Sequence, residues 1–238
     1  KNLHVTSLPS YNGDLEYDLQ KNALFNNWVN CIYYSSNNKL YFGTYNGFGC
    51  IDINTHDFVS TYGINQFLQG EVVYAIYEDR DKNIWIGTHN GLIKFNTQTQ
   101  EFKSYTTDDG LPSTSIAAIK GDDNDNLWIS TNYGVARFHT QSENIVNFYT
   151  RDGLQGNEFT KGAAFQGRRG DINFGGPGGV TFFNPKEIIN PNKKLQIKIS
   201  DFYVHDKSIY RKIASENKGI VNMDIDRTNE FYLSNQDT

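Results

Sequence analysis

One sequence pattern occurs four times in this chain of 238 residues, and it constrains the fold more than any other feature. Each copy is a run of aromatic and β-branched residues interrupted by glycine: FGTYNGFGCID at 42–52, IGTHNGLIKFN at 86–96, ISTNYGVARFH at 129–139 and FGGPGGVTFFN at 174–184. The copies lie 43 to 45 residues apart. A unit of that length holds about four short strands and their turns, which is the size of one β-propeller blade. The repeat therefore predicts an all-β fold of four-stranded antiparallel blades.

Within one repeat the hydrophobic pattern has a period of two residues, which is typical of strands. The second copy predicts four strands, here named A to D, near 72–78, 84–88, 92–96 and 101–106. The A to B turns are polar, and each B to C turn ends in glycine, as in Asn46-Gly47 and Asn90-Gly91. We expect both residues of such a pair to have a positive φ angle, because that conformation suits a tight hairpin.

The repeats leave both ends of the chain unexplained. Residues 1–21 contain no clear copy, and we expect them to be an outer strand or a remnant of a preceding blade. Residues 22–184 hold about four blades, which are too few for the usual closed ring and predict an incomplete one. Its open faces would be covered by blades preceding Lys1 or by a second copy of the chain.

A different pattern follows the last repeat. Residues 185–194 contain two prolines and read as a stiff linker. Residues 195–238 again alternate apolar and polar side chains, which predicts the first strands of an Ig-like β-sandwich. A complete sandwich takes about 100 residues, so we expect this one to be truncated.

The composition of the chain limits which classes of partner are expected. The net charge is -5 and the basic residues are scattered, so nucleic acid is not an expected partner. No apolar run is long enough to span a bilayer, so membrane contact is expected only through segments outside this chain. Cys31 and Cys50 fall on non-adjacent predicted strands of one blade, and we expect two free thiols.

The recurring aromatic residues have a structural interpretation. Trp85 and Trp128 occupy one position of strand B, and Phe95 and Phe138 one position of strand C, so we expect them to pack between blades. Trp28 has no aromatic counterpart in the later copies. The repeat does not require it, and it is therefore a candidate for contact with a ligand or a neighbouring domain.

Motifs for metal, cofactor and catalytic sites are not found. The DDNDN stretch at 122–126 resembles a calcium loop but lacks the glycine and the bidentate glutamate at the required spacings, so we interpret it as a hairpin turn. The five histidines show no zinc-ligand spacing, and no nucleophile elbow, phosphate loop or dinucleotide fingerprint occurs. We expect no catalytic residue, metal or cofactor in this segment, although a propeller lyase or glycosidase is a third, less favoured interpretation.

Three groups of motifs resemble one known family. They are the blade sequences NIWIGTHNGLIKFN and NLWISTNYGVARF, the junctions DDGLPSTSI and RDGLQGNEF, and the exit FGGPGGVTFFNPKEI followed by ISDFYVHDKSI. Together they resemble the two-component regulator propeller repeats and the start of the Y_Y_Y domain that follows them, over about residues 22–210. The resemblance implies the periplasmic sensor region of an inner-membrane hybrid two-component histidine kinase. It also implies an oligosaccharide ligand, self-association as a dimer, and kinase parts beyond Thr238.

The repeat geometry locates the expected ligand site. If strand A lines the central channel, the B to C turns and the junctions between blades open on one face, where loops from several blades converge. Aromatic, amide and charged side chains in these loops suit sugar rings and hydroxyls. The candidates are Trp28, Tyr45, Asn46, His89, Asn90, Asp108, Asp109, Asn132, Tyr133, Arg151, Asn157 and Glu158. The alternative function is a propeller scaffold that binds protein and no small molecule.

Overall fold

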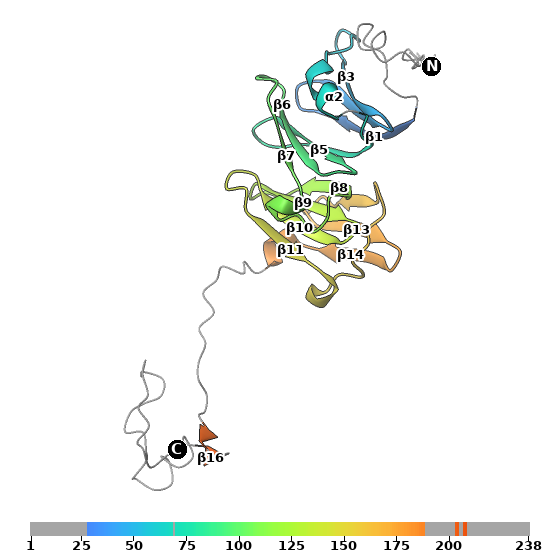
Figure 1. Ribbon diagram of the computed structural model, residues 1–238. Helices are drawn as coiled ribbons and strands as arrows, with labels where there is room; N and C mark the ends of the chain where they lie inside the picture. Colours follow the sequence, from blue (N-terminus) through green and yellow to red (C-terminus); the bar gives the residue numbers. More distant parts are fainter. Residues whose placement is uncertain (1–27, 69, 189–202, 205–206, 209–238) are drawn as a thin grey trace. The chain divides into compact units, whose positions relative to one another are not determined.

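The computed structural model describes residues 28–68, 70–188, 203–204 and 207–208 (Figure 1). The chain divides into two units, Lys1–Ile188 and Ile189–Thr238. In the second unit, β15 (Tyr203–Val204) pairs antiparallel with β16 (Lys207–Ser208). The expected strand or remnant at 1–21, most of the linker and the rest of the expected sandwich lie outside the described residues.

Two four-stranded antiparallel blades occupy the middle of the first unit, and they confirm the predicted fold. Blade 2 contains β4 (Val73–Glu78), β5 (Asn83–Thr88), β6 (Leu92–Asn96) and β7 (Phe102–Tyr105). Blade 3 contains β8 (Ile116–Gly121), β9 (Asn126–Thr131), β10 (Gly134–His139) and β11 (Ile145–Phe148). The strands of blade 2 begin and end within one residue of their predicted bounds, because the period-two pattern and the turn residues are local signals.

Blade 1 differs from the four-stranded expectation. It contains β1 (Val29–Tyr34), β2 (Lys39–Thr44) and β3 (Gly47–Asp52), and the fourth strand is reduced to a single bridge between Ile51 and Phe58. Helix α2 (Tyr62–Leu68) follows, and it begins the junction to blade 2. The helix forms here because Ile64 and Leu68, one turn apart, are both buried against the blade.

The side chain of Asn65 replaces part of the missing strand. Its Oδ1 accepts a hydrogen bond from the Phe48 amide at 2.8 Å, and its Nδ2 donates to the Phe48 carbonyl at 2.6 Å. One side-chain amide therefore satisfies both backbone groups that Phe48 presents on the outer edge of β3.

Blade 4 also has three strands: β12 (Ala164–Gln166), β13 (Ile172–Gly176) and β14 (Gly179–Phe183). After β14 the chain enters the short 3-10 helix η3 (Pro185–Glu187), where Asn184 caps the turn by accepting from the Lys186 amide. Proline at the first position of this helix favours a turn over continuation of the strand. Among the described residues, no strand pairs with the outer edge of β14.

The B to C turns correct one prediction. Gly47, Gly91 and Gly134 have positive φ angles, but the residues before them do not. The preceding threonine explains the difference: Thr88 Oγ1 accepts from the Asn90 amide at 3.0 Å and donates to the Gly91 carbonyl at 3.0 Å. The turn is therefore closed by a side chain and followed by one left-handed glycine.

The hydrophobic core lies between successive blades, whose sheets follow one another in chain order (Figure 1). The Trp85 ring of blade 2 lies 5.1 Å from the Phe138 ring of blade 3. The Trp128 ring of blade 3 lies 4.7 Å from the Phe183 ring of blade 4. Both tryptophans are almost completely buried, which confirms that they are packing elements.

The strand-B tryptophans are held by aspartates from the A to B turns. Asp79 is buried, and its carboxylate accepts hydrogen bonds from the Asn83 amide at 2.9 Å and from Trp85 Nε1 at 2.7 Å. In the DDNDN stretch Asp122 bonds Asn126 and Trp128 in the same way. This confirms that the stretch is a hairpin turn, and Asp122 has a structural role in it.

Candidate functional site

The B to C turns and the junctions between blades meet at one end of the sheets. The Gly47 amide donates to the Glu71 carbonyl at 3.0 Å, and the Gly134 amide donates to the Asn157 carbonyl at 2.6 Å. Glu71 and Asn157 belong to the junctions that lead into the next blade. Turns and junctions therefore form one continuous loop face, as the repeat geometry predicts.

On this loop face, blade 1 presents an aromatic pair. The rings of Trp28 and Tyr45 lie 5.6 Å apart, and the two residues are 70% and 50% exposed. The Tyr45 amide donates to the Trp28 carbonyl at 3.0 Å, which holds the turn next to the start of β1. Asn46 is half-buried, and its amide bonds Thr44 Oγ1. Large rings with exposed faces are the side chains that suit the apolar faces of sugars.

Blade 2 contributes polar side chains. His89 and Asn90 are exposed, and Asn90 Nδ2 donates to Glu71 Oε1 at 2.9 Å. Asn90 thereby connects its turn to the junction that enters blade 2.

The junction from blade 2 to blade 3 contains the two candidate aspartates. They end the 3-10 helix η1 (Thr107–Asp109). Asp109 Oδ2 accepts from the Thr106 amide at 2.8 Å, so this carboxylate caps the helix. Asp108 is exposed. The pair therefore has divided roles, with one carboxylate used by the fold.

Three further candidates lie in the B to C turn of blade 3 and in the junction to blade 4, and two of them organise their loops. Asn132 Oδ1 accepts from Ser113 Oγ at 2.5 Å, and Asn157 Oδ1 accepts from the Thr150 amide at 2.9 Å. Glu158 has an exposed side chain, while its carbonyl accepts from a neighbouring glutamine side chain. The two asparagines thus fix the loops that contain the last two candidates, Tyr133 and Arg151.

Those last two, Tyr133 and Arg151, come together through a residue that the sequence analysis did not name. The Tyr149 ring lies 5.8 Å from the Tyr133 ring. The Arg151 guanidinium lies 5.2 Å from the centroid of the Tyr149 ring. We call Tyr133, Tyr149 and Arg151 the Tyr133 cluster. Arg151 is in the 3-10 helix η2 (Thr150–Asp152), and Tyr133 is 57% exposed. The repeat offers no signal for Tyr149, because its counterpart before the preceding junction is Thr106.

Eleven of the twelve candidates therefore fall into two groups, and the twelfth, Asn46, is half-buried with its backbone amide bonded to Thr44 Oγ1. Side chains bonded within the loops belong to Asn90, Asp109, Asn132 and Asn157. The other exposed candidates are Trp28, Tyr45, His89, Asp108, Tyr133, Arg151 and Glu158. Their role in binding stays a prediction.

Comparison with protein families agrees with the repeat. The family model for the two component regulator propeller matches residues 23–46, 68–90 and 110–133. Each matched segment runs from a junction through strands A and B to a B to C turn. The chain carries two-component regulator propeller repeats. The predicted family resemblance is confirmed for blades 1 to 3, which contain the matched segments.

The proteins that this chain matches are much longer. Histidine kinase P4 of Formosa agariphila is 28% identical over 137 residues, which are 58% of this chain and 7% of that protein. The extracellular domain of BT3049 from B. thetaiotaomicron, assigned to the hybrid two-component systems, is 28% identical with a TM-score of 0.60. That match covers 68% of this chain and 22% of the domain. The chain thus spans less than a quarter of either protein.

A second solved structure supports the fold alone. The extracellular domain of BT4673 from B. thetaiotaomicron matches with a TM-score of 0.55 at 22% identity, over 69% of this chain and 22% of that domain. Across the described residues, none of the helices combines the length and apolarity needed to cross a membrane.

Proposed function

We propose that these propeller repeats are part of the periplasmic sensing region of a hybrid two-component histidine kinase anchored in the inner membrane, and that they bind an oligosaccharide. The similarity to a histidine kinase and to the extracellular domain of a hybrid two-component system supports the sensor assignment. The ligand class is supported by the chemistry of the loop face.

The Tyr133 cluster is the observation that carries the ligand proposal. An exposed tyrosine ring beside a second ring offers a flat apolar surface to the C–H face of a sugar. Arg151 extends a planar donor group from the same place, which suits hydroxyls and carboxylates. The Trp28 and Tyr45 pair supplies a second platform at the turn of blade 1. Two aromatic platforms on separate blades suit an oligosaccharide better than they suit a single sugar unit.

Signalling follows from a shift between two arrangements. A ligand that bridges loops of several blades binds one arrangement of the sensing region better than another and so changes their populations. In a dimeric receptor the change would pass to the membrane segments and the kinase. This step involves parts of the protein beyond the residues described above.

Calorimetric titration tests the proposal. The intact sensing region is titrated with a panel of neutral and acidic oligosaccharides, and at least one is expected to bind. Tyr133→Ala should weaken that binding about tenfold, since an aromatic contact contributes about 0.5–1.5 kcal/mol beyond the area it buries. Arg151→Ala should also weaken the binding. Arg168→Ala is its matched control, because Arg168 is exposed on an A to B turn, away from the loop face.

Two results would reject the proposal. One is that no oligosaccharide of the panel binds while a protein binds stoichiometrically, which would favour the alternative of a protein-binding scaffold. The other is binding that Tyr133→Ala and Arg151→Ala leave as tight as Arg168→Ala does.

A further inference from the structure

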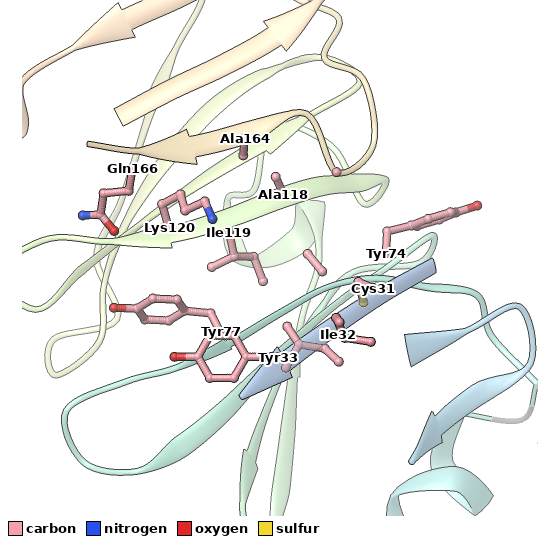
Figure 2. A pocket seen from close by; sticks show the side chains of 13 residues that line it. Cys31, Ile32, Tyr33, Tyr74, Tyr77, Ala118, Ile119, Lys120, Ala164 and Gln166 are labelled. Carbon is pink, nitrogen blue, oxygen red and sulfur yellow. The ribbon is translucent and has the colours of Figure 1, made fainter. Parts of the chain in front are cut away.

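A hollow lies on the innermost strands of the blades. Residues of β1, β4, β8 and β12 line a pocket of about 370 Å³ (Figure 2). The space exists because the inner strands carry small residues where they approach one another, among them Ala75, Ala118 and Ala164. Its volume is near the lower end of the about 300–1,000 Å³ typical of small-molecule sites, so it suits a single small ligand.

One lining residue departs from the repeat. Tyr33, Tyr77 and Lys120 occupy the same position on the first strand of blades 1, 2 and 3, each opposite the large ring of strand B. Two blades therefore satisfy this position with tyrosine, and only the third places an ammonium group there. Packing of the blades does not require a lysine at this place.

Lys120 is half-buried, and it has no counter-charge among the described residues. In the described part of the chain, ion pairs form through Arg80, Lys103, Arg151 and Lys186, and none involves Lys120. Burial lowers the pKa of the Lys120 ammonium. A charge that is partly removed from water is stabilised by an anion placed next to it.

The remaining lining groups indicate what kind of anion fits. Figure 2 shows Lys120 and Gln166 on one side of the pocket and Tyr33 and Tyr77 on the other. The two tyrosine rings lie 6.0 Å apart in an edge-to-face arrangement. Gln166 Nε2 donates to the Gly121 carbonyl at 2.7 Å, which fixes the amide at the pocket wall. Aromatic rings opposite a cation suit a ligand with an apolar ring face and a carboxylate.

We propose that this inner-strand pocket binds a small sugar acid of the hexuronate class, with Lys120 pairing with its carboxylate and the tyrosine rings facing its C–H surface. The site is separate from the Tyr133 cluster and does not depend on oligosaccharide binding there. A propeller with both sites would respond to an oligosaccharide on the loop face and to an acidic monosaccharide within the blades.

Titration with sugars that differ only in the carboxylate tests the pocket. The intact chain is titrated calorimetrically with D-galacturonate, with its neutral counterpart D-galactose, and with acetate as a carboxylate without a ring. Galacturonate is expected to bind more tightly than either. Lys120→Met should weaken galacturonate binding at least about tenfold, because hydrogen bonds to charged groups contribute about 1.5–3 kcal/mol. Lys120→Arg should retain most of it, and Lys82→Met, on an exposed turn, should have no effect.

Lys120→Tyr provides a folding control, because it places the residue of blades 1 and 2 in blade 3. It should keep the thermal midpoint of the free protein and abolish galacturonate binding. The proposal is overturned if galacturonate fails to bind, if Lys120→Met binds it as well as the parent, or if galactose or acetate binds equally well. Arg151→Ala separates the two sites: loss of galacturonate binding in this variant would move the ligand to the loop face and refute the pocket.

Discussion

Replacing the buried Asp79 by asparagine should destabilise the propeller more than any other aspartate substitution in the same turn. Oδ1 of Asp79 accepts from the Asn83 amide at 2.9 Å. Oδ2 accepts from Asn83 Nδ2 at 3.0 Å and from Trp85 Nε1 at 2.7 Å. An asparagine at this position has one acceptor oxygen and one NH₂ group, so one of the buried donors must face another donor.

The magnitude follows from burial. Asp79 is 7% exposed and Trp85 is 0% exposed, so water cannot take the place of the missing acceptor. A buried donor left without an acceptor costs about 1–3 kcal/mol, and the remaining bonds lose the contribution of the carboxylate charge. We expect Asp79→Asn to lower the free energy of unfolding by about 2–3 kcal/mol. Asp122→Asn should cost less, because Asp122 is only half-buried.

Urea unfolding followed by tryptophan fluorescence measures the change. Asp81→Asn is the matched control, since Asp81 is exposed in the same turn, and it should change the free energy by less than about 0.5 kcal/mol. The slope of the free energy with urea should be the same in all three variants. If Asp79→Asn and Asp81→Asn unfold at the same urea concentration, the inferred role of the carboxylate is refuted.

Three further predictions concern the two thiols, the side-chain amide of Asn65 and the glycine at position 91. Burial raises the pKa of the Cys31 thiol to about 12 and that of Cys50 to about 11, so iodoacetamide at pH 8 should label both only in urea; rapid native labelling would contradict this. Asn65→Asp keeps the acceptor for the Phe48 amide but loses the donor to its carbonyl, and thermal unfolding should show a loss of about 1–2 kcal/mol. Gly91→Ala should cost about 1–3 kcal/mol in urea unfolding, because φ is +142° there; an unchanged midpoint would refute the strain.

Much of the fold could be predicted from the sequence because its signals are local. Alternation of side chains along each strand and glycine at each B to C turn depend on neighbours within a few residues, and they predicted the strands of blade 2 within one residue. The repeat also predicted that Trp85 and Trp128 pack between blades, since a large ring recurring once per unit must meet the next unit.

Features made by residues far apart in the chain could not be predicted in this way. The sequence pattern did not reveal that Asn65 replaces part of a strand by bonding Phe48, or that blade 4 has three strands and is followed by a 3-10 helix that begins at Pro185. The expected pair of positive φ angles in each B to C turn was wrong, because a threonine side chain closes the turn instead.

The candidate sites show the same division. The sequence located the loop face and named Tyr133 and Arg151, because turns and junctions recur at fixed intervals. It did not identify Tyr149, which becomes a partner only when the chain folds back beside the turn of β9 and β10. Lys120 is one residue in a regular strand by sequence. It becomes a half-buried cation in a pocket only when the inner strands of four blades come together, since no single blade encloses that space.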